Sequence, residues 1–209
     1  MRKISKKGKK IIGVFILVLV LAGAITFGVL YGLKTFKKPT VKVEKLDEMK
    51  EYDYYLEDNK SDLYKKLYKE LKTVLNKKEV DEEEYAKLVS RLCIADYYNL
   101  DNKMSKNDIG CTQFIKEEYR ENFILESSDT VYKYIEQNIE GNRTQKLPIV
   151  SSVEVSSTDK ISYSYDKIND TSAYDVKLKV TYKEDLGYPT DVEIKLVHTD
   201  KKLDIIYIN

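Results

Sequence analysis

The chain has 209 residues, with 36 basic and 35 acidic side chains and a formal net charge of +1. Six of the basic residues precede Leu33, so the remainder carries 30 basic against 35 acidic side chains, a net charge of −5. A surface of that kind has no basic field, which excludes nucleic acid as an expected partner of this part.

The N-terminal segment predicts a membrane anchor. Residues 1–10 form a basic tail without an acid, and residues 11–33 contain no charge. As a helix this run reaches roughly 34 Å, at about 1.5 Å per residue, which spans a bilayer core of about 30 Å. Short basic tails stay in the cytoplasm, whereas long domains are exported largely regardless of charge. We therefore predict a single-pass protein of the cell membrane, with a cytoplasmic N-terminus and an extracytoplasmic C-terminal domain.

Two further features of this run have alternative interpretations. Ala22-Gly23-Ala24 fits the cleavage pattern of a signal peptide, but the apolar run continues to Tyr31, which favours an uncleaved anchor. Ala24, Gly28 and Gly32 recur every four residues and would form one face for close helix contact and homo-oligomerisation. Small residues are also simply common in membrane helices, and we favour that interpretation.

The part after the anchor begins with a predicted juxtamembrane linker over residues 34–59, followed by a domain over 60–209. Apolar residues at helical spacing predict a first amphipathic helix over 61–76. Asp81 and Glu84 fit a capping box that starts a second helix, whose apolar face continues towards Tyr97. Ser128 is expected to cap another helix that runs to about Asn138.

After Pro148 the periodicity changes from helical to alternating. Val153 and Val155, and then Ile161 to Tyr165, predict two short strands. Residues 174–182 alternate as a half-buried antiparallel strand, and residues 192–196 and 203–207 complete a meander. Helices followed by a curved antiparallel sheet predict an α+β fold.

This order of elements resembles the cystatin-like, nuclear-transport-factor-like fold, in which helices pack on a curved sheet. With the basic tail and single membrane helix, it resembles the bitopic scaffold component of type IV secretion and conjugation machines. The stretch from Asp96 to Lys103, Ser105 to Gly110 and Gln113-Phe114 is similar to uncharacterised membrane-anchored proteins of low-GC Gram-positive bacteria. The first resemblance implies a scaffold role, and the second implies no activity.

Cys93 and Cys111 are the only cysteines. Outside the cell a bridge between a helix and the loop after it is permitted. Two unpaired thiols, with Cys93 buried as a small apolar residue, are the interpretation that we favour.

Motifs for catalysis or cofactor binding are scarce, so we expect no cofactor, no metal and no enzymatic activity. Only Gly110, Gly141 and Gly187 follow the anchor, too few for a phosphate-binding loop. The single histidine, His198, is expected to be partly covered at a strand end. The acidic run 81–84 is explained by the dipole of the helix that it starts, and residues 102–110 do not follow the calcium-loop order.

Tyrosine is the enriched aromatic residue, with 18 copies against five Phe and no Trp. Tyrosine is favoured at protein interfaces, although most copies here fall at core positions. The sequence therefore predicts a membrane-anchored, non-enzymatic interaction or scaffold module with unidentified protein partners, and its most specific form is a subunit of a conjugation or secretion apparatus. The alternative is a cell-surface ligand-binding domain or enzyme that uses a pocket between the inner strand face and the helices.

Overall fold

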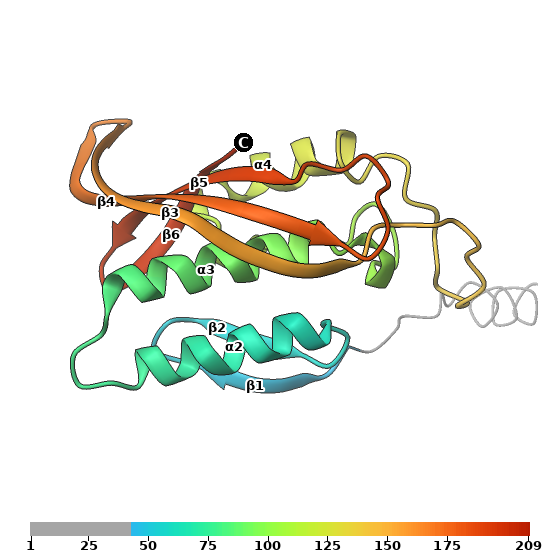
Figure 1. The fold of residues 1–209 in the computed structure, drawn as a ribbon, viewed down its shortest axis with the longest axis horizontal. Helices are drawn as coiled ribbons and strands as arrows, with labels where there is room; N and C mark the ends of the chain where they lie inside the picture. Colours follow the sequence, from blue (N-terminus) through green and yellow to red (C-terminus); the bar gives the residue numbers. More distant parts are fainter. Residues whose placement is uncertain (1–42) are drawn as a thin grey trace, which may run out of the picture. The chain divides into compact units, whose positions relative to one another are not determined.

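The computed structural model describes residues 43–209 (Figure 1). The first elements are two short antiparallel strands, β1 (Lys45–Met49) and β2 (Tyr54–Glu57), joined by a turn in which Asp53 has a positive φ of 53°. This hairpin lies within the segment 34–59 that we expected to be a linker. The folded unit therefore starts earlier than predicted, because the hairpin buries Met49, Tyr54 and Leu56 against the helices that follow.

Two helices follow the hairpin close to their predicted bounds. Helix α2 (Asp62–Leu75) starts where the Ser61 hydroxyl accepts from the Tyr64 backbone N–H. Helix α3 (Glu82–Tyr97) starts where the Asp81 carboxylate accepts from the Glu84 N–H, as predicted. Helix α3 lies between α2 and the sheet, so it is buried on opposite sides over most of its length (Figure 1).

The sheet has four antiparallel strands in the order β3-β4-β5-β6. Their bounds are β3 (Val150–Tyr165), β4 (Ile168–Tyr182), β5 (Asp191–Thr199) and β6 (Lys202–Ile208). The two short strands predicted over 153–165 are one strand, whose polar stretch after Val155 contains a register shift rather than a turn. Val176, Leu178, Ile194 and Leu196 are at most 1% exposed and belong to the same core as α3, so the space between α3 and the sheet is filled.

The third helix differs from the prediction. Helix α4 covers Glu117–Asp129, and the chain after it forms turns instead of the helix expected from Ser128 to Asn138. The Ser128 hydroxyl donates to the Leu125 carbonyl, 2.8 Å away, and so caps no following helix. Thr130 leaves helical geometry, with φ −119° and ψ −96°, and α4 ends there.

The α+β class, with helices packed on an antiparallel sheet, is confirmed. Among residues 43–209, none of the helices has the length and apolar character needed to cross a bilayer. The predicted transmembrane segment 11–33 lies outside the described residues.

Candidate functional site

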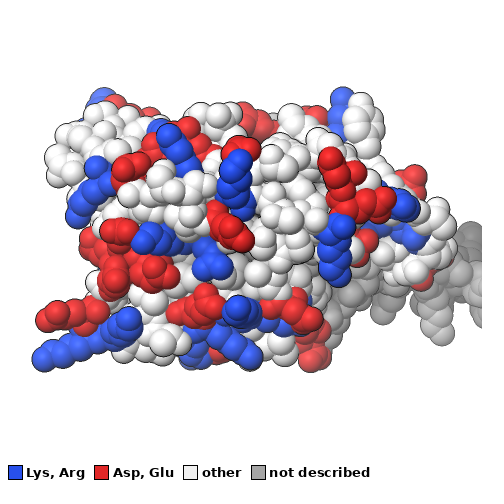
Figure 2. All heavy atoms as spheres, in the orientation of Figure 1, with Lys and Arg blue, Asp and Glu red and all other residues white. Residues whose placement is uncertain are grey.

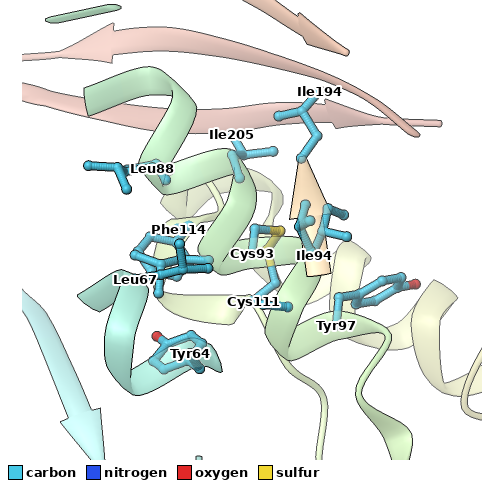
Figure 3. Close-up of a cluster of buried hydrophobic side chains, with 14 of the residues drawn as sticks. Tyr64, Leu67, Leu88, Cys93, Ile94, Tyr97, Cys111, Phe114, Ile194 and Ile205 are labelled. Carbon is cyan, nitrogen blue, oxygen red and sulfur yellow. A yellow bond between two sulfur atoms is a disulfide. The ribbon is translucent and has the colours of Figure 1, made fainter. Parts of the chain in front are cut away.

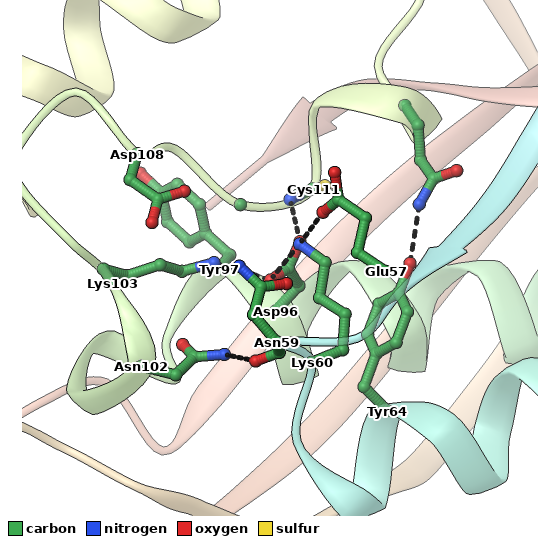
Figure 4. A network of polar contacts seen from close by, with 12 residues as sticks. Glu57, Asn59, Lys60, Tyr64, Asp96, Tyr97, Asn102, Lys103, Asp108 and Cys111 are labelled. Carbon is green, nitrogen blue, oxygen red and sulfur yellow. Dashed lines mark hydrogen bonds and ion pairs between the residues drawn. The ribbon is translucent and has the colours of Figure 1, made fainter. Parts of the chain in front are cut away.

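A cluster of buried and partly buried charges lies where β2, α2 and α3 meet the loop after α3 (Figure 4). Four residues, named here the Asp96 cluster, compose it: Glu57, Lys60, Asp96 and Lys103. Lys103 Nζ lies 2.6 Å from Asp96 Oδ1, and Lys60 Nζ lies 3.1 Å from both Asp96 Oδ2 and Glu57 Oε2. Two positive and two negative charges are thus paired, which offsets much of their desolvation cost.

The electrostatics of Asp96 follow from these contacts. Burial alone would raise the pKa of its carboxyl, but Lys103, Lys60 and the Cys111 backbone N–H hold that pKa well below its usual range. The carboxylate is therefore ionised throughout the physiological pH range. Its role in this geometry is to fix the loop 98–111 against α3.

Cys93 and Cys111 are bonded to each other in the structure, contrary to our preference for free thiols (Figure 3). Their Cα atoms are 4.4 Å apart and both side chains are almost fully buried. Cys111 has a positive φ of 71°, which is unusual for a residue other than glycine. Its N–H donates to Asp96 Oδ2 at 3.0 Å, so the carboxylate and the bridge hold this backbone together.

Gly110 and Gln113 complete this region. A Cβ atom on Gly110 would lie 2.5 Å from the Asp96 carbonyl oxygen, so only glycine allows the loop to approach α3 so closely. Gln113 accepts from the Tyr55 N–H at 2.8 Å and donates to the Tyr64 hydroxyl at 2.7 Å. The residues from Asp96 to Gln113 therefore hold the loop after α3 against that helix and against β2.

His198 lies near the end of β5, partly covered, as expected. Its ring Nδ1 is 2.8 Å from Asp170 Oδ2, and its backbone N–H donates to the same oxygen at 2.7 Å. Burial would raise the pKa of Asp170, but these donors and the Ser172 N–H lower it to about 2. Nε2 lies 3.8 Å from Glu82 Oε1, so the histidine sits between two carboxylates and links β4, β5 and the start of α3.

An open groove lies between α4 and β6, with a volume of about 800 Å³. We call it the α4–β6 groove. Its α4 wall carries Tyr119, Phe123 and Leu125, and its β6 wall is formed by residues 205–209. Tyr97 lies at its base, where its ring packs 5.4 Å from Phe123 and its hydroxyl donates to Ser127 Oγ at 3.1 Å. A mostly apolar groove with a few polar groups suits a peptide segment or an amphipathic ligand.

The other residues singled out in the sequence are the acidic run 81–84 and the small residues of the apolar run. The acidic run 81–84 begins α3, and within residues 43–209 acids, cysteines and the histidine form no group of three that could hold a metal ion. Ala24, Gly28 and Gly32 lie outside the described residues. The groove was missed by sequence reasoning, because α4 lacks an apolar periodicity; the run Phe123-Ile124-Leu125 was the only local signal.

Comparisons with protein-family models, curated proteins and solved structures find no match to this chain.

Proposed function

We propose that the chain is a non-enzymatic, single-pass membrane protein whose domain 43–209 stands outside the cell and binds another protein through the α4–β6 groove. The single observation that carries this proposal is the groove itself. Leu125 is 62% exposed and Tyr207 is 38% exposed on its two walls, although burial would favour both. Neighbouring exposed apolar side chains around a groove are typical of interaction sites.

The membrane placement is supported by the apolar run 11–33, and an external location agrees with a buried disulfide. A membrane-impermeant thiol reagent tests it in intact cells, on a chain with a cysteine in place of Thr40. Labelling before lysis is the expected result. Labelling only after lysis would place the domain inside.

Protein binding is tested with a photoreactive amino acid at Leu125 of the full chain in its own cells. The matched control is the same group at Tyr134, which is 77% exposed and does not line the groove. We expect a covalent adduct with another protein from position 125 and none from position 134. Equal labelling at both positions, or none at either, would contradict the proposal.

The narrower form of the proposal is a scaffold subunit of a conjugation or secretion apparatus, which the order of elements and the anchor support. Deleting the gene and measuring DNA transfer tests this form, and unchanged transfer would contradict it.

Self-association through Ala24, Gly28 and Gly32 is tested by Gly28→Leu in a membrane two-hybrid assay. If these residues form a close helix contact, the substitution should weaken the free energy of association by about 1–2 kcal/mol. Unchanged association would show that the three small residues form no such contact.

A further inference from the structure

The β6 wall of the groove has an open backbone edge. Strand β6 pairs with β5 on one side, and Asn209 exchanges both backbone hydrogen bonds with Glu193, at 3.0 and 3.3 Å. Successive residues of an antiparallel strand point their N–H and C=O groups to opposite sides. The backbone groups of Ile208 therefore face away from β5, into the groove.

The chain itself already uses the first part of this edge. Ile115 forms a parallel bridge with Ile205, and the Lys116 N–H donates to the Ile205 carbonyl at 2.9 Å. Directly after that contact the chain turns away into α4. Within residues 43–209, β6 has no other strand on its outer side, so the edge from Ile206 onward is left without a partner.

The opposite wall of the groove, helix α4, is negatively charged. Residues 117–129 contain Glu117, Glu118, Glu121, Glu126 and Asp129 against one base, Arg120, a net charge of −4. Glu126 and Asp129 are exposed and line the groove. Lys116, the nearest lysine before the helix, is already paired with Glu118 at 3.2 Å. The groove therefore combines aromatic and aliphatic walls with an acidic rim.

We infer that the occupant of the groove is an extended segment of a partner protein that adds as a strand to the outer edge of β6. Its apolar side chains enter the groove between Phe123 and Tyr207, and its Lys or Arg side chains reach Glu126 and Asp129. Backbone hydrogen bonds give such strand addition its affinity, and the pockets and charges beside the edge give specificity. This inference rests on the proposed function and specifies how its groove is used.

The test uses the full chain in zwitterionic nanodiscs and a fluorescent peptide, Lys-Val-Tyr-Val-Lys-Val-Lys, followed by anisotropy, with empty nanodiscs as the baseline. Two altered peptides accompany it. One carries N-methyl groups on alternate residues, which removes backbone donors, and the other has Glu in place of each Lys. We expect the first peptide to bind and each alteration to weaken binding at least tenfold.

A charge-reversed chain sharpens the test. Glu126→Lys with Asp129→Lys should weaken the basic peptide at least tenfold and strengthen the acidic one. Glu79→Lys, an exposed acid of the α2–α3 loop outside the groove, should change neither. If the N-methylated peptide binds as tightly as the first peptide, strand addition is wrong. If Glu79→Lys weakens binding of the basic peptide as much as the groove variant does, the effect comes from the overall charge of the domain and not from the groove.

The remaining outcomes separate this inference from the proposed function. If no peptide binds but the photoreactive group at Leu125 still captures a protein, the strand mode is wrong and the proposed function stands. If that adduct is a second copy of the chain, a partner segment is not the occupant. If neither the peptide nor any protein is bound, both fail.

Discussion

The Asp96 cluster and the α4–β6 groove lie on the same domain and are built in opposite ways. Around Asp96, paired charges, a disulfide and a close glycine contact hold the loop 98–111 against α3. Helix α4 buries only Ser127, and polar contacts from Tyr97 to Ser127, Tyr119 to Asp166 and Arg120 to Ile115 fasten it. The Asp96 cluster is held by specific buried contacts, whereas the α4–β6 groove exposes apolar side chains and backbone groups. Substitutions in the cluster should therefore lower the stability of the domain, and substitutions in the groove should weaken binding without lowering stability.

The largest effect is expected from Asp96→Asn. The change removes the acidic partner of Lys103 and leaves Lys60 paired with Glu57 alone. Breaking a buried ion pair lowers the free energy of unfolding by about 3–5 kcal/mol. Denaturant unfolding measures it. Asp101→Asn, an exposed neighbour, serves as the control and should change stability by less than about 0.5 kcal/mol. Equal small losses in both variants would show that the charges around Asp96 are not buried.

Loss of the disulfide comes next. Replacing Cys93 and Cys111 together by Ala frees a loop with a sequence separation of 18, which corresponds to about 3 kcal/mol in the chain-entropy account. A thiol reductant should lower the melting temperature of the parent chain and leave that of the double variant unchanged. The same response to reductant in both would mean that the cysteines are not bridged.

Gly110→Ala should destabilise by about 2 kcal/mol, because the added methyl group meets the Asp96 carbonyl and the packed loop must shift. Gly141→Ala is the matched control: its φ is +71° and nothing lies within 4 Å of the added atom. The control should lose only the cost of a left-handed backbone, about 1 kcal/mol. A larger loss at Gly141 than at Gly110 would contradict the close approach.

The pH dependence of stability should report Asp170. Its pKa falls from 3.8 to about 2 on folding, so its contribution is present above the unfolded value and disappears as the pH drops through about 2. Asp170→Asn should lose about 1 kcal/mol at neutral pH, less than the full 1.36 kcal/mol per pKa unit would give, because solvent screens the carboxylate at this partly covered site. Urea unfolding of both chains from pH 7 to pH 2 should show the difference closing below about pH 4. If the difference in unfolding free energy between the two chains stays the same from pH 7 to pH 2, the loss comes from packing and not from the ionised carboxylate.

The smallest effect on folding is expected in the groove. Leu125→Ser should alter the unfolding free energy by less than about 0.5 kcal/mol, since the side chain is already largely exposed. The same variant should weaken peptide binding. A large loss of stability, measured by denaturant unfolding, would make Leu125 part of the core and would remove the contrast between the two regions.

Strong periodicity explains which elements could be predicted. Helices α2 and α3 and the strands after Tyr174 have continuous apolar faces, and their partners lie directly on those faces. Helix α4 was predicted about eleven residues too late in the chain, because its sequence EEYRENFILESSD has no such face. Ser128 is of a residue type that often caps a helix N-terminus, and this led to the wrong start. Strand β3 was divided in two because its polar middle hides a register shift.

The sites were harder to predict than the elements. The Asp96 cluster joins positions 57, 60, 96 and 103, which only the packing of β2, α2 and α3 brings together. The pairing of Cys93 with Cys111 depends on a left-handed residue that no spacing indicates. The groove is a space between α4 and β6, about 80 residues apart in the chain, and its existence depends on a helix that periodicity does not reveal.

The position of the disulfide in the chain has a consequence for the order of assembly. Both cysteines precede Val150, the first residue of the sheet. During synthesis, α2, α3 and the loop to Cys111 are complete while the strands that cover α3 do not yet exist. A bridge formed in an oxidising compartment at that stage can link the loop to α3 before the sheet arrives. The N-terminal half then presents a preformed surface on which the four strands fold.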